Sequence, residues 1–163
     1  MTKEDYPITP AVRFLRDRKV LFKPHQYQYQ EHGGTRVGAA ALNLPEHMLI
    51  KTLVMENDQL KPLIVLMHGD CEVSTKQLAR AIGTRSVEPC DDRTAARATG
   101  YIFGGTSPFG TRTRLPVYVE RSIFTLSSIL INGGKRGFLV EIDPQVLRDL
   151  LPVTEVEVAI PNP

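Results

Sequence analysis

The seven residues from Gly104 to Gly110, Gly-Gly-Thr-Ser-Pro-Phe-Gly, form the segment of this sequence best suited to chemistry. Gly104 and Gly105 can adopt backbone conformations closed to other residues, and they let a ligand approach the main chain. Successive N–H groups in such a turn can bind an anion or a polarised carbonyl, and Pro108 stiffens the exit of the loop. The alternative is a tight turn that needs its glycines only for conformation.

Two known chemistries are excluded for this loop. A phosphate-binding P-loop ends in Gly-Lys-Ser/Thr, whereas Gly110 is followed by Thr-Arg. A nucleophile elbow reads Gly-x-Ser-x-Gly, whereas Ser107 is followed by Pro-Phe. Ser107 is therefore a poor candidate for an acyl-forming nucleophile, and hydrolysis at this loop would use water or a group of the substrate.

Lys51 is the second candidate, because it is the only charge in the apolar segment from Met48 to Met55. An ammonium at an interior strand position is partly desolvated and can serve as a hydrogen-bond donor or an electrostatic clamp. The alternative is a lysine at a strand edge that points into solvent.

A second glycine-rich segment runs from Asn132 to Gly137 and carries Lys135 and Arg136. Its cations could clamp a phosphate. The alternative is a hairpin turn with solvated charges.

His25 and Tyr27 fall on one face of an alternating segment, where their rings either border a ligand or cover the core. The four histidines show no ligand spacing such as His-x-x-x-His, and Cys71 and Cys90 have no Cys-x-x-Cys spacing. We therefore assign no metal, no disulfide and no cofactor.

The composition is that of an ordinary globular protein, with 42% hydrophobic and 23% charged residues in 163. No apolar run approaches the roughly 20 residues that span a bilayer, and the first residues lack a signal-peptide core. We expect a cytoplasmic protein with no membrane association. The net charge of +2 permits local contact with a nucleic acid without demanding it.

Short strands outnumber helices along the chain, and they position these candidates. Thr9, Thr35, Ser74 or Thr75, and Asp91 or Asp92 are predicted to cap helices. Strands are predicted over 21–29, 48–55, 63–68, 101–103, 117–119, 129–131, 138–142 and 153–158, and helices over 9–19, 35–44, 74–83, 91–98 and 143–150.

This pattern predicts one α/β domain over residues 1–163, with a mixed, partly closed, barrel-like β-sheet surrounded by short helices. The helices are too few for a regular βαβ winding. The last strand, 153–158, is expected to close the sheet.

Taken in order, these segments resemble the YbaK/ProX family of aminoacyl-tRNA deacylases, which are related to the editing domain of prolyl-tRNA synthetase. The resemblance runs from the Thr-Pro-Ala start of the first helix to about Leu151. It is carried by His25-x-Tyr27, Lys51-Thr52-Leu53-Val54, Ser74-Thr75-Lys76, the loop 104–110 and Gly133-Gly134-Lys135-Arg136-Gly137.

The resemblance implies an editing-domain-like fold and hydrolysis of the ester between a wrong amino acid and the 3′ adenosine of tRNA. It makes Lys51 the central functional side chain, places Gly105 at the reacting carbonyl and places Tyr27 at the border of the substrate. It implies the aminoacyl-tRNA acceptor end and prolyl-tRNA synthetase as partners. Substrate contacts are expected from Thr106, Ser107, Asn132, Gly133 and Arg136.

The expected substrate is Cys-tRNA(Pro), with Ala-tRNA(Pro) or another mischarged tRNA as the alternative. Cys-tRNA(Pro) deacylases of this family resemble Ser-Gly-Gly-x-Arg-Gly-x-Asp, whereas this chain has Asn132 and Leu139 at the serine and aspartate positions. Basic side chains are expected to meet the tRNA acceptor end: Lys135, Arg136 and either Arg112 or Arg114. Two other functions stay open: a module that binds aminoacyl-tRNA or a synthetase without catalysis, and a hydrolase for another small ester.

Overall fold

The computed structural model describes residues 5–163, and its centre is an eight-stranded mixed sheet. The strand order is β1-β8-β7-β2-β3-β6-β9, and β5 pairs with β2 off this path. The strands of this sheet are β1 Lys23–Gln26, β2 Leu49–Asn57, β3 Pro62–His68, β5 Val87–Pro89, β6 Val117–Glu120, β7 Ile129–Lys135, β8 Phe138–Ile142 and β9 Val153–Val156.

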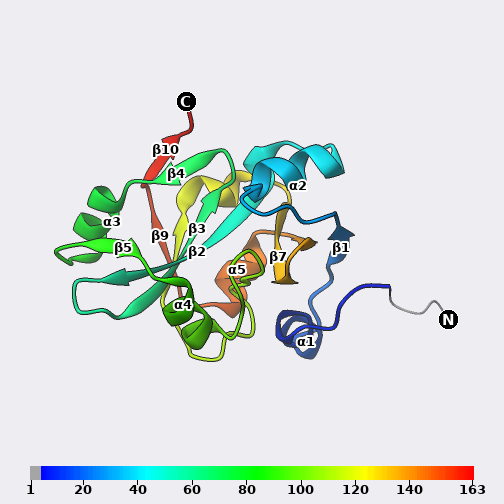
Figure 1. The fold of residues 1–163 in the computed structure, drawn as a ribbon, viewed down its shortest axis with the longest axis horizontal. Coiled ribbons are helices and arrows are strands. Elements are labelled where there is room, and N and C mark those ends of the chain that lie inside the picture. Colours follow the sequence, from blue (N-terminus) through cyan, green and yellow to red (C-terminus); the bar gives the residue numbers. More distant parts are fainter. Residues whose placement is uncertain (1–4) are drawn as a thin grey trace.

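Five short helices and a small second sheet complete the described part of the chain (Figure 1). The second sheet pairs β4 (Cys71–Val73) with β10 (Ala159–Pro161). The helices are α1 Pro10–Asp17, α2 Gly34–Leu42, α3 Thr75–Ile82, α4 Asp92–Thr99 and α5 Gln145–Leu150, with 3₁₀ turns at Glu46–Met48 and Arg121–Thr125. No helix among residues 5–163 is long and apolar enough to cross a membrane.

The predicted α/β class and mixed sheet are confirmed, but the sheet does not close into a barrel. The central β2–β3 hairpin is antiparallel, whereas β2 pairs with β7, β3 with β6 and β6 with β9 in parallel. The closing strand predicted at 153–158 is instead the edge strand β9. Strand β9 pairs with β6 at one end of the strand order, and β1 lies at the other end. Because β9 and β1 do not pair with each other, the sheet keeps two open edges.

Helix starts followed the local capping chemistry in three of four cases. Thr9, Ser74 and Asp91 each accept a hydrogen bond from a backbone N–H of the first turn. Thr35 does not cap its helix, because α2 already begins at Gly34. The Thr35 hydroxyl instead donates to the carboxylate of Glu46, at 2.8 Å.

Two segments differ from their predicted conformation. Residues 101–103 form no strand, because the chain turns there and the N–H of Gly105 donates to the carbonyl of Ile102. The strand predicted over 21–29 is limited to β1, where Lys23–Gln26 pairs with β8.

The second glycine segment also differs, because most of it belongs to strand β7 rather than to a turn. The pairing of β7 with β8 shifts register between Asn132 and Lys135, and the reversal itself lies at residues 135–137. The side-chain oxygen of Asn132 accepts from the N–H of Gly134 at 2.6 Å and from that of Lys135 at 3.2 Å. This contact holds an irregular strand end beside the glycine loop.

The sheet has an apolar core on each face. Along β3, Ile64 and Leu66 pack in one core, and Leu63, Val65 and Met67 pack in the other, as expected for alternating strand positions. Helices α1 and α5 cover the first face, and α3 covers the second. A smaller cluster joins α2 to β2, β7 and β8. Strand β2 is therefore held on both faces, which makes it a rigid base for side chains.

Candidate functional site

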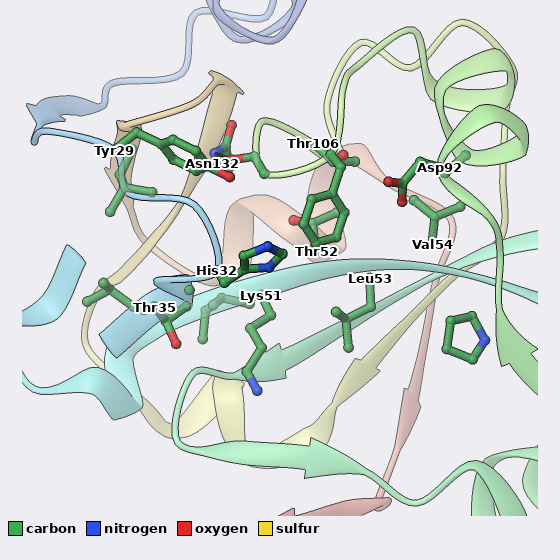
Figure 2. Close-up of a pocket in the computed structure, with 18 of the residues that line it drawn as sticks. Tyr29, His32, Thr35, Lys51, Thr52, Leu53, Val54, Asp92, Thr106 and Asn132 are labelled. Atoms are coloured by element: carbon green, nitrogen blue, oxygen red, sulfur yellow. Dashed lines mark hydrogen bonds between the residues drawn. The ribbon is translucent and has the colours of Figure 1, made fainter. Parts of the chain in front are cut away.

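A cavity of about 520 Å³ opens along β2 (Figure 2). Its walls come from five stretches far apart in the sequence: the segment after β1, the start of α2, β2 itself, the β5–α4 region and the glycine loop, with β7 and β8 behind. The lining includes Tyr27, Tyr29, His32, Thr35, Leu49, Lys51, Thr52, Cys90, Asp92, Phe103, Gly104, Thr106, Leu130, Asn132 and Leu139. Four of the eight predicted site residues are among them.

Lys51 lies on β2 and is half-buried. Its ammonium donates to the backbone carbonyl of Cys71 on β4, at 2.5 Å. Figure 2 shows its side chain extending away from Thr106 and Asn132. No carboxylate among residues 5–163 forms a salt bridge with Lys51. Its positive charge is therefore held by one neutral acceptor, which an anionic ligand could replace with a stronger charge-assisted hydrogen bond.

Tyr27 covers the apolar end of the cavity. It packs with Leu49, Leu130 and Leu139, and its ring lies so close to Gly38 that a Cβ there would come within 3.2 Å. Burial raises the pKa of Tyr27, and the neighbouring phenol of Tyr29 adds to the shift. Tyr27 therefore stays a neutral phenol at physiological pH and can donate one hydrogen bond.

The glycine loop is held against this wall by side chains of the second glycine segment. The amide of Asn132 donates to the carbonyl of Gly104 at 3.2 Å, and Nε of Arg136 donates to the carbonyl of Phe103 at 2.8 Å. The guanidinium of Arg136 also lies 5.0 Å from the ring centroid of Tyr29. Asn132 thus lines the cavity, whereas Arg136 fastens the loop from outside it.

Gly105 lies where the glycine loop meets the end of strand β7. It is buried, and a Cβ on it would lie 2.9 Å from the backbone nitrogen of Arg136. Its own N–H is used inside the turn, at 2.9 Å from the carbonyl of Ile102. The N–H of Thr106, the next along the chain, has no acceptor among residues 5–163. Gly105 thus lets two backbones touch, and the N–H of Thr106 is a free donor in the loop beside the cavity.

Ser107 and Gly133, both predicted to contact the substrate, are not among the residues that line the cavity. Ser107 is fully buried, and its hydroxyl accepts from the N–H of Phe109 at 3.2 Å. Gly133 packs against the ring of Phe138, where a Cβ would come within 2.4 Å. Both residues are packed into the wall beside the cavity.

Several lining residues were not predicted from the sequence. The hydroxyl oxygen of Thr52 is buried and has no hydrogen-bond partner within residues 5–163. Thr52 lies on the side of β2 that faces Thr106 (Figure 2). Phe103 is 59% exposed at the rim. Thr52 could have been predicted as a lining residue because it is next to Lys51, and Phe103 because it precedes the glycine loop. Nothing in the sequence around His32 or Asp92 indicates a place in the cavity, since His32 lies in a loop after a strand and Asp92 starts a helix.

Cys90 also lines the cavity, but its thiol is not activated. Burial raises the pKa of Cys90 to about 11, and the nearby Glu56 carboxylate adds to the shift. The thiol therefore stays protonated at neutral pH, whereas the nucleophilic form is the thiolate.

The family of aminoacyl-tRNA editing domains matches residues 34–150, a stretch that contains most of the cavity wall. The chain is 31% identical over 143 residues to the Enterococcus faecalis protein named "Putative Cys-tRNA(Pro)/Cys-tRNA(Cys) deacylase EbsC", and the match covers 87% of each chain. It is also 25% identical over 93 residues to the proline–tRNA ligase of Brachyspira hyodysenteriae. That match covers 57% of this chain and 16% of the ligase.

Solved structures share the architecture. A crystal structure described as that of "a putative trans-editing enzyme for prolyl tRNA synthetase" matches with a TM-score of 0.82. The match covers 94% of this chain and 99% of that one, at 19% sequence identity. At this level of identity the likeness concerns the fold.

Proposed function

Because the chain belongs to the family of aminoacyl-tRNA editing domains, we propose that it hydrolyses the ester between a wrongly attached amino acid and the terminal adenosine of a tRNA. The observation that carries this proposal is the cavity along β2, whose lining includes both Lys51 and residues of the glycine loop. The homology to proline–tRNA ligases supports the tRNA acceptor end as the partner.

In the proposed reaction, the oxygen of water attacks the ester carbonyl carbon, and the bond from that carbon to the ribose oxygen breaks. The attacking water loses one proton and the ribose oxygen gains one, which leaves a free amino acid and a tRNA with an intact terminal hydroxyl. Since Cys90 stays protonated and Ser107 is buried, the proposal uses no protein nucleophile. A group of the substrate itself, such as a ribose hydroxyl or a cysteinyl thiol, can position the water.

The free N–H of Thr106 is our proposed donor to the developing oxyanion. Removing one such donor in other hydrolases costs about 3–4 kcal/mol of transition-state stabilisation. Lys51 is proposed to exchange the Cys71 carbonyl for a phosphate or ribose oxygen of the terminal nucleotide. Exchange for a phosphate oxygen replaces a neutral acceptor by an anionic one, which strengthens the bond.

The apolar end of the cavity favours a small side chain on the amino acid. Asn132 and Leu139 are direct partners across β7 and β8. The two residues that differ from the Cys-tRNA(Pro) deacylase pattern therefore lie side by side in the cavity wall. We propose cysteine as the first substrate and alanine as the second. Discrimination by an apolar wall is worth only about 1–3 kcal/mol per methylene, so contacts with the tRNA must supply the rest.

The proposal is tested by amino-acid release from Cys-tRNA(Pro), Ala-tRNA(Pro) and cognate Pro-tRNA(Pro). We expect rapid release from at least one mischarged tRNA, and a loss of roughly 100-fold or more in Lys51→Ala, a size typical of electrostatic groups at such sites. Lys61→Ala is the matched control, because Lys61 is an exposed lysine in the β2–β3 turn.

Unchanged release by a folded Lys51→Ala protein would contradict the role of Lys51. If tRNA binds without release of any amino acid, the chain is instead a module that recognises aminoacyl-tRNA.

A further inference from the structure

A second group of reactive side chains lies beyond Lys51, where the turn after β3 enters β4. His47 Nδ1 lies 2.8 Å from a carboxylate oxygen of Asp70, and the same oxygen lies 3.5 Å from Sγ of Cys71. All three ligand atoms lie within 4.8 Å of one another. An imidazole nitrogen, a carboxylate oxygen and a sulfur therefore converge on one point.

The His47 ring is held in place by a second histidine. The rings of His47 and His68 stack with centroids 3.7 Å apart and an interplanar angle of 8°. Nδ1 of the buried His68 pairs with the carbonyl of His47, and its Nε2 pairs with the hydroxyl of Ser122. Because a carbonyl can only accept, His68 donates from Nδ1 to the carbonyl of His47. This hydrogen bond and the ring stacking together fix the position of His47.

One side of this group is open to solvent. The side chains of His47 and Asp70 are 46% and 43% exposed, while Cys71 is buried beneath them. An ion could therefore enter from solvent and meet Sγ of Cys71 at the bottom of the site.

We propose that His47, Asp70 and Cys71 bind a divalent ion of the zinc class, with solvent as the fourth ligand. Zinc accepts this mixture of nitrogen, oxygen and sulfur ligands, whereas magnesium and calcium require oxygen. Ligand atoms of a tetrahedral zinc site lie about 3.3–3.8 Å apart, given bonds of about 2.0–2.3 Å. The Asp70–Cys71 separation already fits, and the His47–Asp70 pair must open by roughly 0.5 Å as Nδ1 loses its proton.

The test is titration of the metal-free full chain with Zn²⁺ by calorimetry and with Co²⁺ by absorption. We expect one ion per chain and a near-ultraviolet charge-transfer band from a Co²⁺–thiolate bond. Cys71→Ser should abolish that band, and His47→Ala should weaken binding by at least about tenfold, since loss even of an outer-shell partner costs that much. Cys90→Ser is the matched control, because it leaves Cys71 as the sole cysteine.

A cobalt complex without a thiolate band, or Zn²⁺ affinity unchanged in His47→Ala, would overturn the proposal. His47 is exposed, so its variant gives a decisive result even if Cys71→Ser does not fold. The measurement contains no tRNA, so its outcome is independent of the proposed editing activity.

Discussion

At the scale of single residues, Phe103 exposes a large aromatic ring that is not buried in the core. It lies at the rim of the cavity, and burying an aromatic ring normally stabilises a protein. An exposed ring beside the proposed ester site offers a face on which a nucleobase can stack. Lys51 and Thr106 would then hold the sugar and carbonyl while Phe103 holds the terminal adenine.

We predict that Phe103→Ala raises KM for the mischarged tRNA by about tenfold, because stacking of one base contributes about 1–3 kcal/mol. Ile102→Ala is the matched control, since Ile102 precedes it in the same loop and is also 59% exposed. Steady-state deacylation kinetics of both variants measure the effect. Equal KM values for the two variants would show that Phe103 does not bind the substrate.

At the scale of elements, the glycine loop and strand β7 act as one unit. The loop carbonyls of Phe103 and Gly104 accept from Arg136 and Asn132, and Gly105 brings the two backbones into contact. A loop fastened at three points keeps the N–H of Thr106 in one orientation. Such preorganisation is what makes a backbone donor effective during catalysis.

We predict that Arg136→Ala lowers kcat by about tenfold, whereas Lys135→Ala changes it by less than about twofold, because a loosened oxyanion donor loses part of its contribution. Each variant removes one positive charge, but only Arg136 holds the loop. The measurement is kcat at low and high salt.

If Arg136 acted only through its charge on tRNA, the two variants would not differ. Both would weaken tRNA binding equally, and the effect would fade as salt increases.

At the scale of the whole molecule, the cavity depends on the pairing of the sheet edge. Strand β1 carries the chain to Tyr27 and Tyr29 and is attached to the sheet through β8 alone. His25 on β1 bonds to Glu141 on β8 at 2.8 Å, and Ser128 donates to the same carboxylate at 3.2 Å. This cluster ties the cavity wall to the sheet.

The hydrogen bond from His25, followed by that from Ser128, lowers the pKa of Glu141 from 4.5. A depressed pKa in the folded state adds stability that is present above pH 4.5 and is lost as the pH falls through the folded value. We predict that Glu141→Gln lowers the thermal midpoint at pH 7, and that the difference from the parent protein shrinks below pH 4.5.

Glu88→Gln is the control for this measurement, because Glu88 is exposed on β5. A difference in thermal midpoint that stays constant down to pH 2 would show that the Glu141 charge does not stabilise the edge.

Features encoded within a few neighbouring residues were predictable from the sequence. The caps at Thr9, Ser74 and Asp91 and the β2–β3 hairpin form from local hydrogen bonds and alternation, and the ordered motifs indicated the family. The candidate Lys51 also follows from local context, since it is one charge in an apolar strand.

The remaining features depend on register and packing between distant segments. Whether Gly105 faces a ligand or a backbone is decided by how closely β7 approaches the loop. The spacing of histidines and cysteines along the chain indicated no metal site, and the grouping of His47, Asp70 and Cys71 arises only because the turn after β3 places Asp70 and Cys71 beside His47. Such contacts join residues more than 20 positions apart, and no local pattern encodes a distance that only the packed sheet sets.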